Sequence, residues 1–164
     1  MSAATTTWDV AASVLDPEVP VLTIADLGIL RAVEDTGDGV TVVITPTYSG
    51  CPAMDAIRDD VVRAFHEAGR DDVRVELTLS PAWTTDWITE DGRRKLEEFG
   101  IAPPSPAGGP GRSGRGPVGL TLSLRCPQCG SPDTRELSRF GSTACKSLWV
   151  CNACREPFDH FKTI

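Results

Sequence analysis

Four cysteines near the end of the chain have the spacing of a metal site. They form two CxxC pairs, Cys126 with Cys129 and Cys151 with Cys154, separated by twenty-one residues. Each CxxC loop can turn two thiolates toward one tetrahedral ion, and the intervening residues are enough for strands that carry both loops together. A segment of about 45 residues is too small for an adequate core, so a metal becomes a condition of its folding.

Zinc is the ion that this pattern favours, in a β-rich zinc ribbon. Four Cys ligands fill all coordination positions of a tetrahedral ion. We therefore predict a structural site with one zinc ion per chain rather than a catalytic site. A rubredoxin-like iron site or an iron–sulfur cluster is the alternative, because the same thiolates also bind iron. The expected strands of the ribbon are residues 120–124 and 147–150.

The thiol of Cys51 is a separate candidate, at a predicted turn between a strand and a helix. A β-branched run at residues 40–44 predicts the strand, and Pro52 suits the first position of the helix. A thiol at this place faces the positive end of the helix, which lowers its pKa and favours a nucleophile or a metal ligand. The charge of Asp55 opposes this effect, and a small buried cysteine that closes the turn is the alternative.

Other residues of reactive type have weaker patterns. Asp16 and Glu18 flank Pro17 and invite an acid–base role, although exposed acids at the end of a helix are far commoner. Trp83 and Trp87 can form an aromatic wall for a ligand or can simply cover a small sheet. No GxGxxG, P-loop, GxSxG, HExxH or kinase signature occurs, so enzymatic activity has no support beyond one cysteine.

Three more residues could bind metal but lack the spacing of ligands. Cys145 lies six residues before Cys151, and we interpret it as a packing residue or a redox-labile thiol rather than a ligand. His66 and His160 are isolated in the sequence. We interpret both as surface or structural residues.

The composition is typical of an ordinary globular chain. It has 164 residues, of which 40% are hydrophobic and 24% are charged. No apolar run approaches the roughly 20 residues that span a bilayer, and the N-terminus lacks the pattern of a signal peptide. We therefore expect a cytoplasmic protein with no membrane partner, and in a reducing compartment two CxxC pairs point to metal rather than to disulfides.

The formal charge of −7 is divided unevenly along the chain. Residues 1–101 carry eight Lys/Arg and nineteen Asp/Glu, a balance of −11, whereas residues 102–164 have a balance of +4. The acidic body repels nucleic acid and suits a protein partner with a basic face. The basic tail is a weak argument for a nucleic-acid contact. We predict protein partners and no nucleic acid, and the sequence leaves the oligomeric state open.

Hydrophobic periodicity predicts an α+β body with the element order α, β, β, α, β, α. Thr7 is the expected N-cap of the first helix. Alternating apolar and polar residues at 73–79 are the clearest sign of a half-buried strand. This order implies a three-stranded sheet with helices on one face. The other expected elements are strands at residues 29–34 and 40–44, a helix that follows Cys51, and a helix at residues 89–99.

Three parts are expected along the chain. Residues 102–119 are rich in Pro, Gly and Ser without apolar periodicity, which predicts a flexible linker. The linker separates a body domain at residues 7–101 from the ribbon at residues 120–164. Its ends would lie on the order of 20 to 25 Å apart, so the tail can reach its own body or a partner.

Several motifs of the chain occur together and in order. Those of the body are Asp16-Pro17-Glu18, Asp26-Leu27-Gly28, Thr45-Pro46-Thr47-Tyr48-Ser49-Gly50-Cys51-Pro52 and Pro81-Ala82-Trp83-Thr84-Thr85-Asp86-Trp87. In these motifs the chain resembles the metal–sulfur cluster assembly domain shared with SufT-type proteins. With the CxxC pairs and the segments 140–146 and 156–162, it resembles the PaaD (PaaJ) family of subunits of the phenylacetyl-CoA 1,2-epoxidase system. Ala82 departs from the second proline of many relatives.

The resemblance implies an accessory protein of aerobic phenylacetate degradation that is not catalytic alone. In that system a di-iron oxygenase is fed by an iron–sulfur flavin reductase, and both belong to the implied partners. The implied role is to mature or deliver the cluster of the reductase, with Cys51 as a transient carrier of iron or a cluster, assisted by Asp16 or Glu18. The alternative is a structural subunit of the epoxidase complex in which Cys51 is merely buried.

Overall fold

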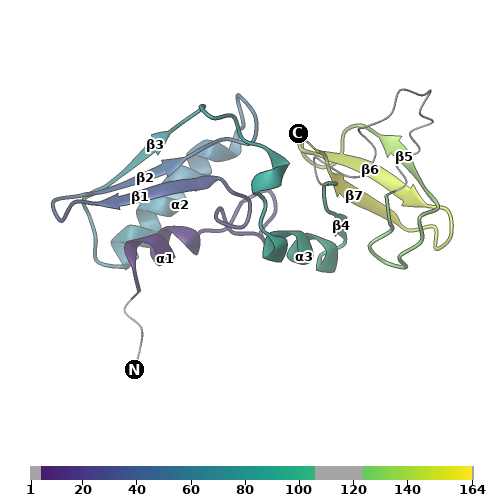
Figure 1. The fold of residues 1–164 in the computed structure, drawn as a ribbon, viewed down its shortest axis with the longest axis horizontal. Helices are drawn as coiled ribbons and strands as arrows, with labels where there is room; N and C mark the ends of the chain where they lie inside the picture. The colour runs from purple at the N-terminus through teal and green to yellow at the C-terminus, as the bar shows by residue number, and fades with distance from the viewer. Residues whose placement is uncertain (1–4, 106–123, 164) are drawn as a thin grey trace. The chain divides into compact units, whose positions relative to one another are not determined.

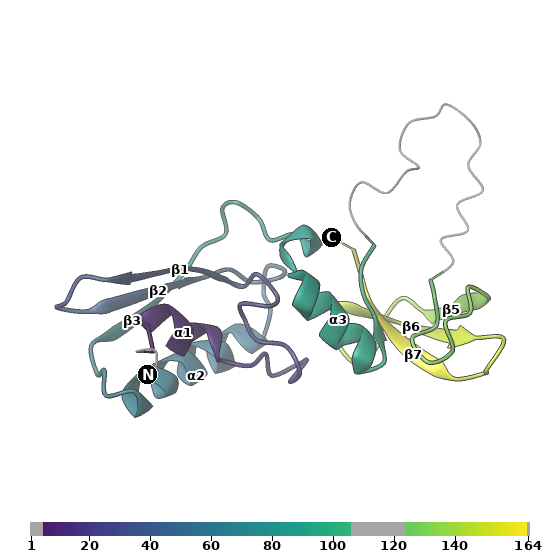
Figure 2. The same cartoon turned by 60° about the horizontal axis from the view of Figure 1, so that its bottom comes forward.

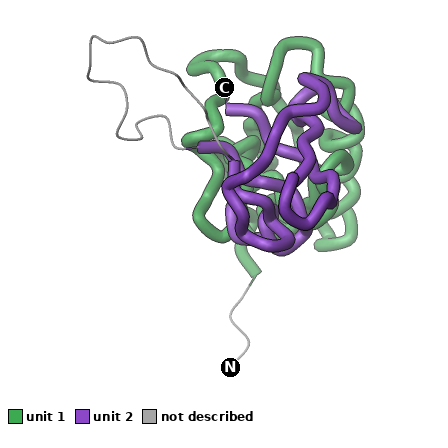
Figure 3. The backbone as a smooth tube through the Cα atoms, turned by 90° about the vertical axis from the view of Figure 1, so that its right-hand side faces the viewer, with its two compact units in different colours: residues 1–92 green, residues 93–164 purple. Residues whose placement is uncertain are grey.

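The structure of the protein is a computed structural model that describes residues 5–105 and 124–163. The chain divides into two compact units, residues 1–92 and 93–164, which are coloured separately in Figure 3. The N-terminal unit is the helix-and-sheet body. The C-terminal unit contains the two CxxC pairs.

The body is built from a three-stranded sheet with helices on one face. Its elements are α1 (Thr7–Ala12), β1 (Leu30–Asp35), β2 (Val40–Ile44), α2 (Ala53–Glu67), β3 (Val73–Leu77) and the short 3₁₀ helix η1 (Thr85–Trp87) (Figure 1). The strand order is β1-β2-β3, with β1 antiparallel and β3 parallel to β2. Helices α1 and α2 lie beneath the same face of the sheet in Figure 2. The predicted α+β class and element order are confirmed.

Local sequence explains where the body helices begin and end. The N-cap of helix α1 is Thr6, one residue earlier than predicted. The Asp9 N–H donates to the Thr6 hydroxyl, and the Thr6 N–H donates to the Asp9 carboxylate. Helix α2 begins after Pro52, which is its N-cap rather than its first residue, and ends before Gly69, whose φ is +81°. The buried face of α2 consists of Ala53, Met54, Ile57, Val61 and Phe65.

Strand β3 differs from the prediction of a half-buried strand at residues 73–79. It ends at Leu77, whose side chain is 44% exposed, and Leu79 beyond it is 67% exposed. The central strand β2, in contrast, buries Val40, Val42 and Ile44 almost completely. The alternating pattern correctly predicted a strand, but it could not tell an edge position from a central one.

The turn at Asp26-Leu27-Gly28 packs against the loop that carries the two tryptophans. Trp83 is 4% exposed, and its indole N–H donates to the Leu27 carbonyl at 2.8 Å. Trp87 packs against Gly28 so closely that a Cβ added at Gly28 would lie 2.6 Å from the Trp87 Cβ. The Arg31 guanidinium covers the Trp87 ring at 3.7 Å. The packing favours a structural role for this aromatic pair over a wall for a ligand.

The C-terminal unit is a four-stranded sheet of order β4-β7-β6-β5. Its elements are β4 (Ile101–Ala102), β5 (Thr134–Ser138), β6 (Lys146–Cys151) and β7 (Pro157–Phe161). The expected strand at residues 147–150 lies in β6, whereas the one at 120–124 lies, apart from Leu124, outside the described residues. The combination of a helix-covered sheet and a β-rich tail is the predicted architecture.

The two compact units divide within α3 (Glu90–Glu98), and the expected boundary after residue 101 stays a prediction. Strand β4 pairs in parallel with β7 and so belongs to the C-terminal sheet. Most of the expected linker, residues 106–119, lies outside the described residues. Among the helices of the described part of the chain, none has the length and apolarity needed to cross a membrane.

Candidate functional site

The Cys51 turn connects the end of β2 to the start of α2, as the sequence predicted. The Cys51 N–H donates to the Tyr48 carbonyl at 3.3 Å, which closes the turn. Gly50 has φ +86°, a conformation that glycine adopts without strain. The Cys51 side chain is half-buried as a free thiol.

The pKa of the Cys51 thiol is raised on balance, although the first N–H of α2 acts to lower it, as predicted for a helix N-terminus. Burial is the largest cause, and the charges of Glu18 and then Asp16 act in the same direction. Hydrogen bonds to the sulfur from the Ala53 N–H and the Thr47 hydroxyl lower the pKa without overcoming these effects. The predicted opposition to a thiolate is therefore real, but Glu18 and Asp16 provide it rather than Asp55, whose side chain is 93% exposed.

Asp16 is a buried structural residue and not an exposed acid at the end of a helix. It is 5% exposed, and its Oδ1 accepts the N–H groups of Glu18 at 2.8 Å and Val19 at 2.7 Å. These bonds fix the turn that follows α1 and hold both carboxylates within electrostatic reach of Cys51. Sequence reasoning selected the three residues but missed the Thr47 hydroxyl, which lies in the same loop.

A protonated thiol beside two carboxylates favours one kind of chemistry. Negative neighbours destabilise a thiolate, which is unfavourable for an ordinary nucleophile. The same negative charges attract a cation, whose own charge then makes deprotonation of the thiol favourable. The arrangement of Cys51, Glu18 and Asp16 therefore suits a metal-binding thiol better than a nucleophilic one.

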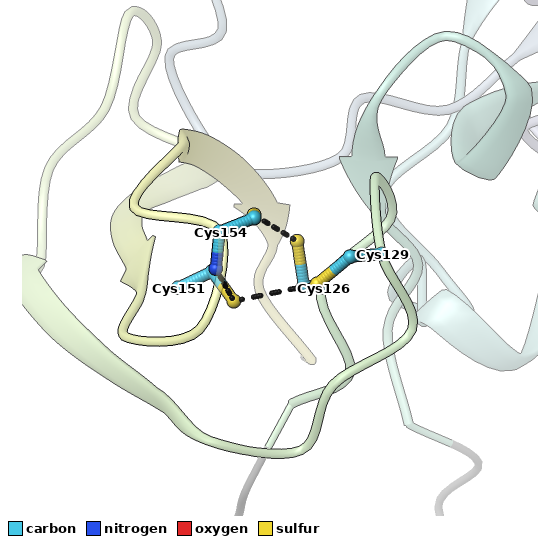
Figure 4. Close-up of side chains that lie close together, drawn as sticks. All are labelled: Cys126, Cys129, Cys151 and Cys154. Atoms are coloured by element: carbon cyan, nitrogen blue, oxygen red, sulfur yellow. Dashed lines mark hydrogen bonds between the residues drawn. The ribbon is translucent and has the colours of Figure 1, made fainter.

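The two CxxC pairs meet in one cluster in the C-terminal unit. Figure 4 shows the side chains of Cys126, Cys129, Cys151 and Cys154 turned toward one another from two loops. The Cys126 and Cys154 sulfurs are 3.7 Å apart, those of Cys129 and Cys151 are 3.6 Å apart, and all four lie within 4.8 Å of one another. The prediction that the four thiols form one site is confirmed as a cluster that can hold a metal ion.

Each CxxC loop is shaped by backbone contacts of its own. In the first loop the Gly130 N–H donates to the Cys126 carbonyl at 2.8 Å, and Gly130 has φ +73°. In the second loop Arg155 holds the corresponding position with φ +64°, and the Cys154 N–H points to the Cys151 sulfur at 3.5 Å. That backbone N–H is the main reason why the pKa of Cys151 is lowered to about 7.

The cluster fits zinc in its donor set and in its spacing. With Zn–S bonds of about 2.3 Å, the sulfurs of a tetrahedral site lie about 3.8 Å apart, close to the two shorter distances here. Cys126 and Cys151 are buried in the small core with Ala102 and Phe158, whereas Cys129 and Cys154 are exposed. Two ligands are thus part of the packing of the unit, which agrees with a structural role for the ion.

The remaining cysteine and the histidines lie outside this cluster. Cys145 is 5% exposed with its sulfur 3.0 Å from the Thr143 hydroxyl, which agrees with a packing role. His160 is partly buried, its Nδ1 lies 3.3 Å from the Ser147 hydroxyl, and burial lowers its pKa to about 4. His66 is on the surface of α2.

The two parts of the chain match two known families. Residues 8–77 match the family described as iron–sulfur cluster assembly protein, and residues 112–162 match the PaaD zinc β-ribbon domain. The first match contains the Cys51 turn, and the second contains all four cysteines of the cluster. The four-cysteine site is therefore a metal site in a zinc-ribbon domain.

Comparison with individual proteins agrees with these matches. The chain is 48% identical over 157 residues, 96% of its length and 91% of the relative, to a protein of Escherichia coli (strain K12) named as a candidate component of 1,2-phenylacetyl-CoA epoxidase. Over 86 residues, 51% of this chain and 81% of the relative, it is 38% identical to a protein of Porphyromonas gingivalis named as an auxiliary factor of Fe–S protein maturation.

A solved structure supports the fold of the body alone. A domain of unknown function from Bacillus anthracis superimposes with a TM-score of 0.50 at 22% sequence identity. The match covers 55% of this chain and 87% of that one. Both the fold and the family matches thus place a known domain type around the Cys51 turn.

Proposed function

Because the chain belongs to the PaaD family of 1,2-phenylacetyl-CoA epoxidase components, we propose that it matures the iron–sulfur cluster of the reductase of that system. An accessory role follows from the family, and the specific client is the proposal. The observation that carries it is the half-buried Cys51 thiol, which lies within electrostatic reach of Glu18 and Asp16 in a domain of the cluster-assembly type. We expect both the reductase and the other epoxidase subunits among its partners.

In this proposal Cys51 binds iron or a cluster as a temporary ligand. The thiol loses its proton when the metal–sulfur bond forms, and the nearby carboxylates of Glu18 and Asp16 stabilise the positive charge of the metal. A cysteine thiolate of the client then replaces Cys51 at the metal, and Cys51 takes up a proton again. This exchange changes no oxidation state and needs no further reactant.

The C-terminal unit has a different task in the proposal. Its four cysteines hold one structural zinc ion, as their burial and spacing suggest, and the folded ribbon contacts the client. The unit is basic overall, with eleven Lys/Arg against six Asp/Glu in residues 93–164. It therefore suits an acidic surface on one of the epoxidase components.

The test is the cluster content of the reductase made in cells with wild-type protein, with the Cys51→Ala variant or without the protein. We expect Cys51→Ala to fold normally but to yield a reductase poor in iron and acid-labile sulfide, as in cells that lack the protein. Cys145→Ala is the matched control, because this buried thiol takes no part in the exchange and its variant should give a loaded reductase. A fully loaded reductase from the Cys51→Ala cells would contradict the proposal.

The second candidate is a structural subunit of the epoxidase complex. The half-buried position of Cys51 and the raised pKa of its thiol favour it, because both also describe a cysteine that only closes a turn. In that case the protein would co-purify with the oxygenase subunits in a fixed ratio, and the Cys51→Ala variant would behave as wild type. The cluster analysis of the reductase separates the two candidates.

A further inference from the structure

The outer edge of β3 is able to accept another strand. Strand β3 (Val73–Leu77) is at one end of its sheet, and no strand in the described part of the chain pairs with its outer side. The carbonyl of Asp72 and the N–H of Thr78 both bond to β2 at 2.9 Å. Because the backbone groups of a strand point alternately to its two sides, those of Val75 and Leu77 point away from the sheet.

The same edge exposes apolar side chains. Leu77 is opposite Ile44 in the register, on the side of the sheet that the helices cover, yet it is 44% exposed while Ile44 is fully buried. Leu79 lies two residues beyond the end of β3 and is 67% exposed. A strand added along β3 would bury these side chains next to its own, which is the usual mode of recognition by an exposed sheet edge.

The edge leads directly to the Cys51 turn. Strands β2 and β3 are parallel, so their carboxyl ends lie together, and the Thr45 hydroxyl at the end of β2 donates to the Thr78 carbonyl at 2.7 Å. The Cys51 turn continues from Thr45. A segment docked along β3 therefore extends toward the thiol. The thiol lies near the carboxyl ends of the two parallel strands, where sheets with crossover helices usually bind ligands.

Charge distinguishes between the possible occupants of this edge. Residues 1–92 carry five Lys/Arg and seventeen Asp/Glu, a formal balance of −12. A second copy of the body would therefore be repelled, whereas a basic segment would be attracted. We propose that the outer edge of β3 binds an extended, basic segment of the client protein, which adds as a fourth strand and covers Leu77 and Leu79. This inference rests on the proposed function and names the surface that the client contacts.

Two variants of the full chain test the edge by independent means. Val75→Pro removes an N–H that points outward, and proline is tolerated at such positions of edge strands. The double variant Leu77→Thr, Leu79→Thr keeps the strand but removes the apolar contact. Arg74→Lys is the matched control, because it keeps the charge of an exposed residue of β3 whose backbone faces β2. Thermal unfolding confirms that each variant is folded.

The measurement is the affinity of each protein for the purified apo form of the reductase at low salt. We expect Val75→Pro and the double variant each to weaken binding about tenfold, which corresponds to the loss of one hydrogen bond or of a small apolar contact. Arg74→Lys should bind as wild type. In the wild-type complex the amide hydrogens of Val75 and Leu77 should exchange more slowly with solvent than in the free protein.

Three results would overturn the inference. They are unchanged affinity of both variants, no complex with the apo reductase, or a wild-type dimer that Val75→Pro dissociates, which would assign the edge to a second copy. The proposed function fails separately, when the reductase is fully loaded in Cys51→Ala cells although the β3 variants still weaken the complex.

Discussion

The protonated state of Cys51 decides what this thiol can do. A cysteine that attacks carbon needs an accessible thiolate, and its neighbours are usually positive. Here the sulfur is half-buried within electrostatic reach of Glu18 and Asp16, and its pKa is raised. A metal cation changes this balance because it replaces the proton and is itself attracted by the carboxylates. Under the proposed function, Cys51 therefore reacts only when a metal cation is present.

Alkylation measures this state directly. We expect iodoacetamide to modify Cys51 more slowly than a free cysteine at neutral pH, with a rate that rises only at a pH above the ordinary cysteine pKa. Because the Glu18 charge contributes to the raised pKa, Glu18→Gln should move the midpoint to lower pH. Peptide mass spectrometry locates the label, and Cys51→Ala shows its background. A wild-type midpoint below that of free cysteine would contradict the assignment.

The sequence singled out Cys51, Asp16 and Glu18 as candidate site residues but gave no signal for the electrostatic environment of the thiol. Cys51 was correctly placed between a strand and a helix, and a helix N-terminus does favour a thiolate. The opposing charges come from the turn after α1, far away in the sequence, and depend on the Asp16 hydrogen bonds that fix this turn. Burial of the sulfur likewise depends on tertiary packing. Neither effect has a local signal in the sequence.

The turn at Gly28 shows how one element depends on another. Gly28 has φ +72°, and an added Cβ would lie 2.6 Å from the Trp87 Cβ and 2.7 Å from the Trp87 carbonyl oxygen. Gly28→Ala therefore combines backbone strain with a clash, and we expect a loss of about 2 to 4 kcal/mol in the free energy of unfolding. Gly37→Ala is the control, since Gly37 has φ +85° and nothing within 4 Å.

Denaturant unfolding of both glycine variants measures this difference. Gly37→Ala should lose only the strain, about 1 to 2 kcal/mol. Equal losses in the two variants would mean that the tryptophan loop moves away from the turn at little cost. The motifs Asp26-Leu27-Gly28 and Trp83 to Trp87 would then not stabilise each other.

Elements with strong periodicity were predictable, and their surroundings were less so. The buried face of α2 and the strand β2 follow directly from the spacing of their apolar residues. The pattern of β3 is equally regular, but β3 is an edge strand, so Leu77 and Leu79 are exposed. The alternation of apolar residues in a single sequence predicts a strand. It does not show whether other strands pair with that strand on one side or on both.

The two units of the molecule depend on different sources of stability. The body has a core formed by α2 and the sheet, whereas the C-terminal unit includes Cys126 and Cys151 in its small core. We expect Cys126→Ser to lower zinc from close to one ion per chain to almost none and to unfold the C-terminal unit alone. Amide hydrogen exchange of β5, β6 and β7 reports on that unit, and exchange of α2 reports on the body. Cys145→Ser is the control and should keep its zinc.

Metal analysis of the purified protein checks the identity of the ion as well. Equimolar iron with charge-transfer colour would contradict the zinc assignment. Loss of the body fold together with the ribbon would contradict the independence of the two units. The Pro/Gly/Ser-rich stretch predicts that the chain has two parts. The pairing of β4 with β7 has no signal in the sequence, because β4 has only two residues.

The exposed edge of β3 also has a consequence for the behaviour of the protein in solution. An unpaired strand edge with apolar side chains is a template for aggregation, which natural proteins usually block with charge or a covering loop. In this molecule the high negative charge of the body acts as that block, since it keeps copies apart at a distance. Screening by salt weakens this repulsion, so colloidal stability should decline as ionic strength rises.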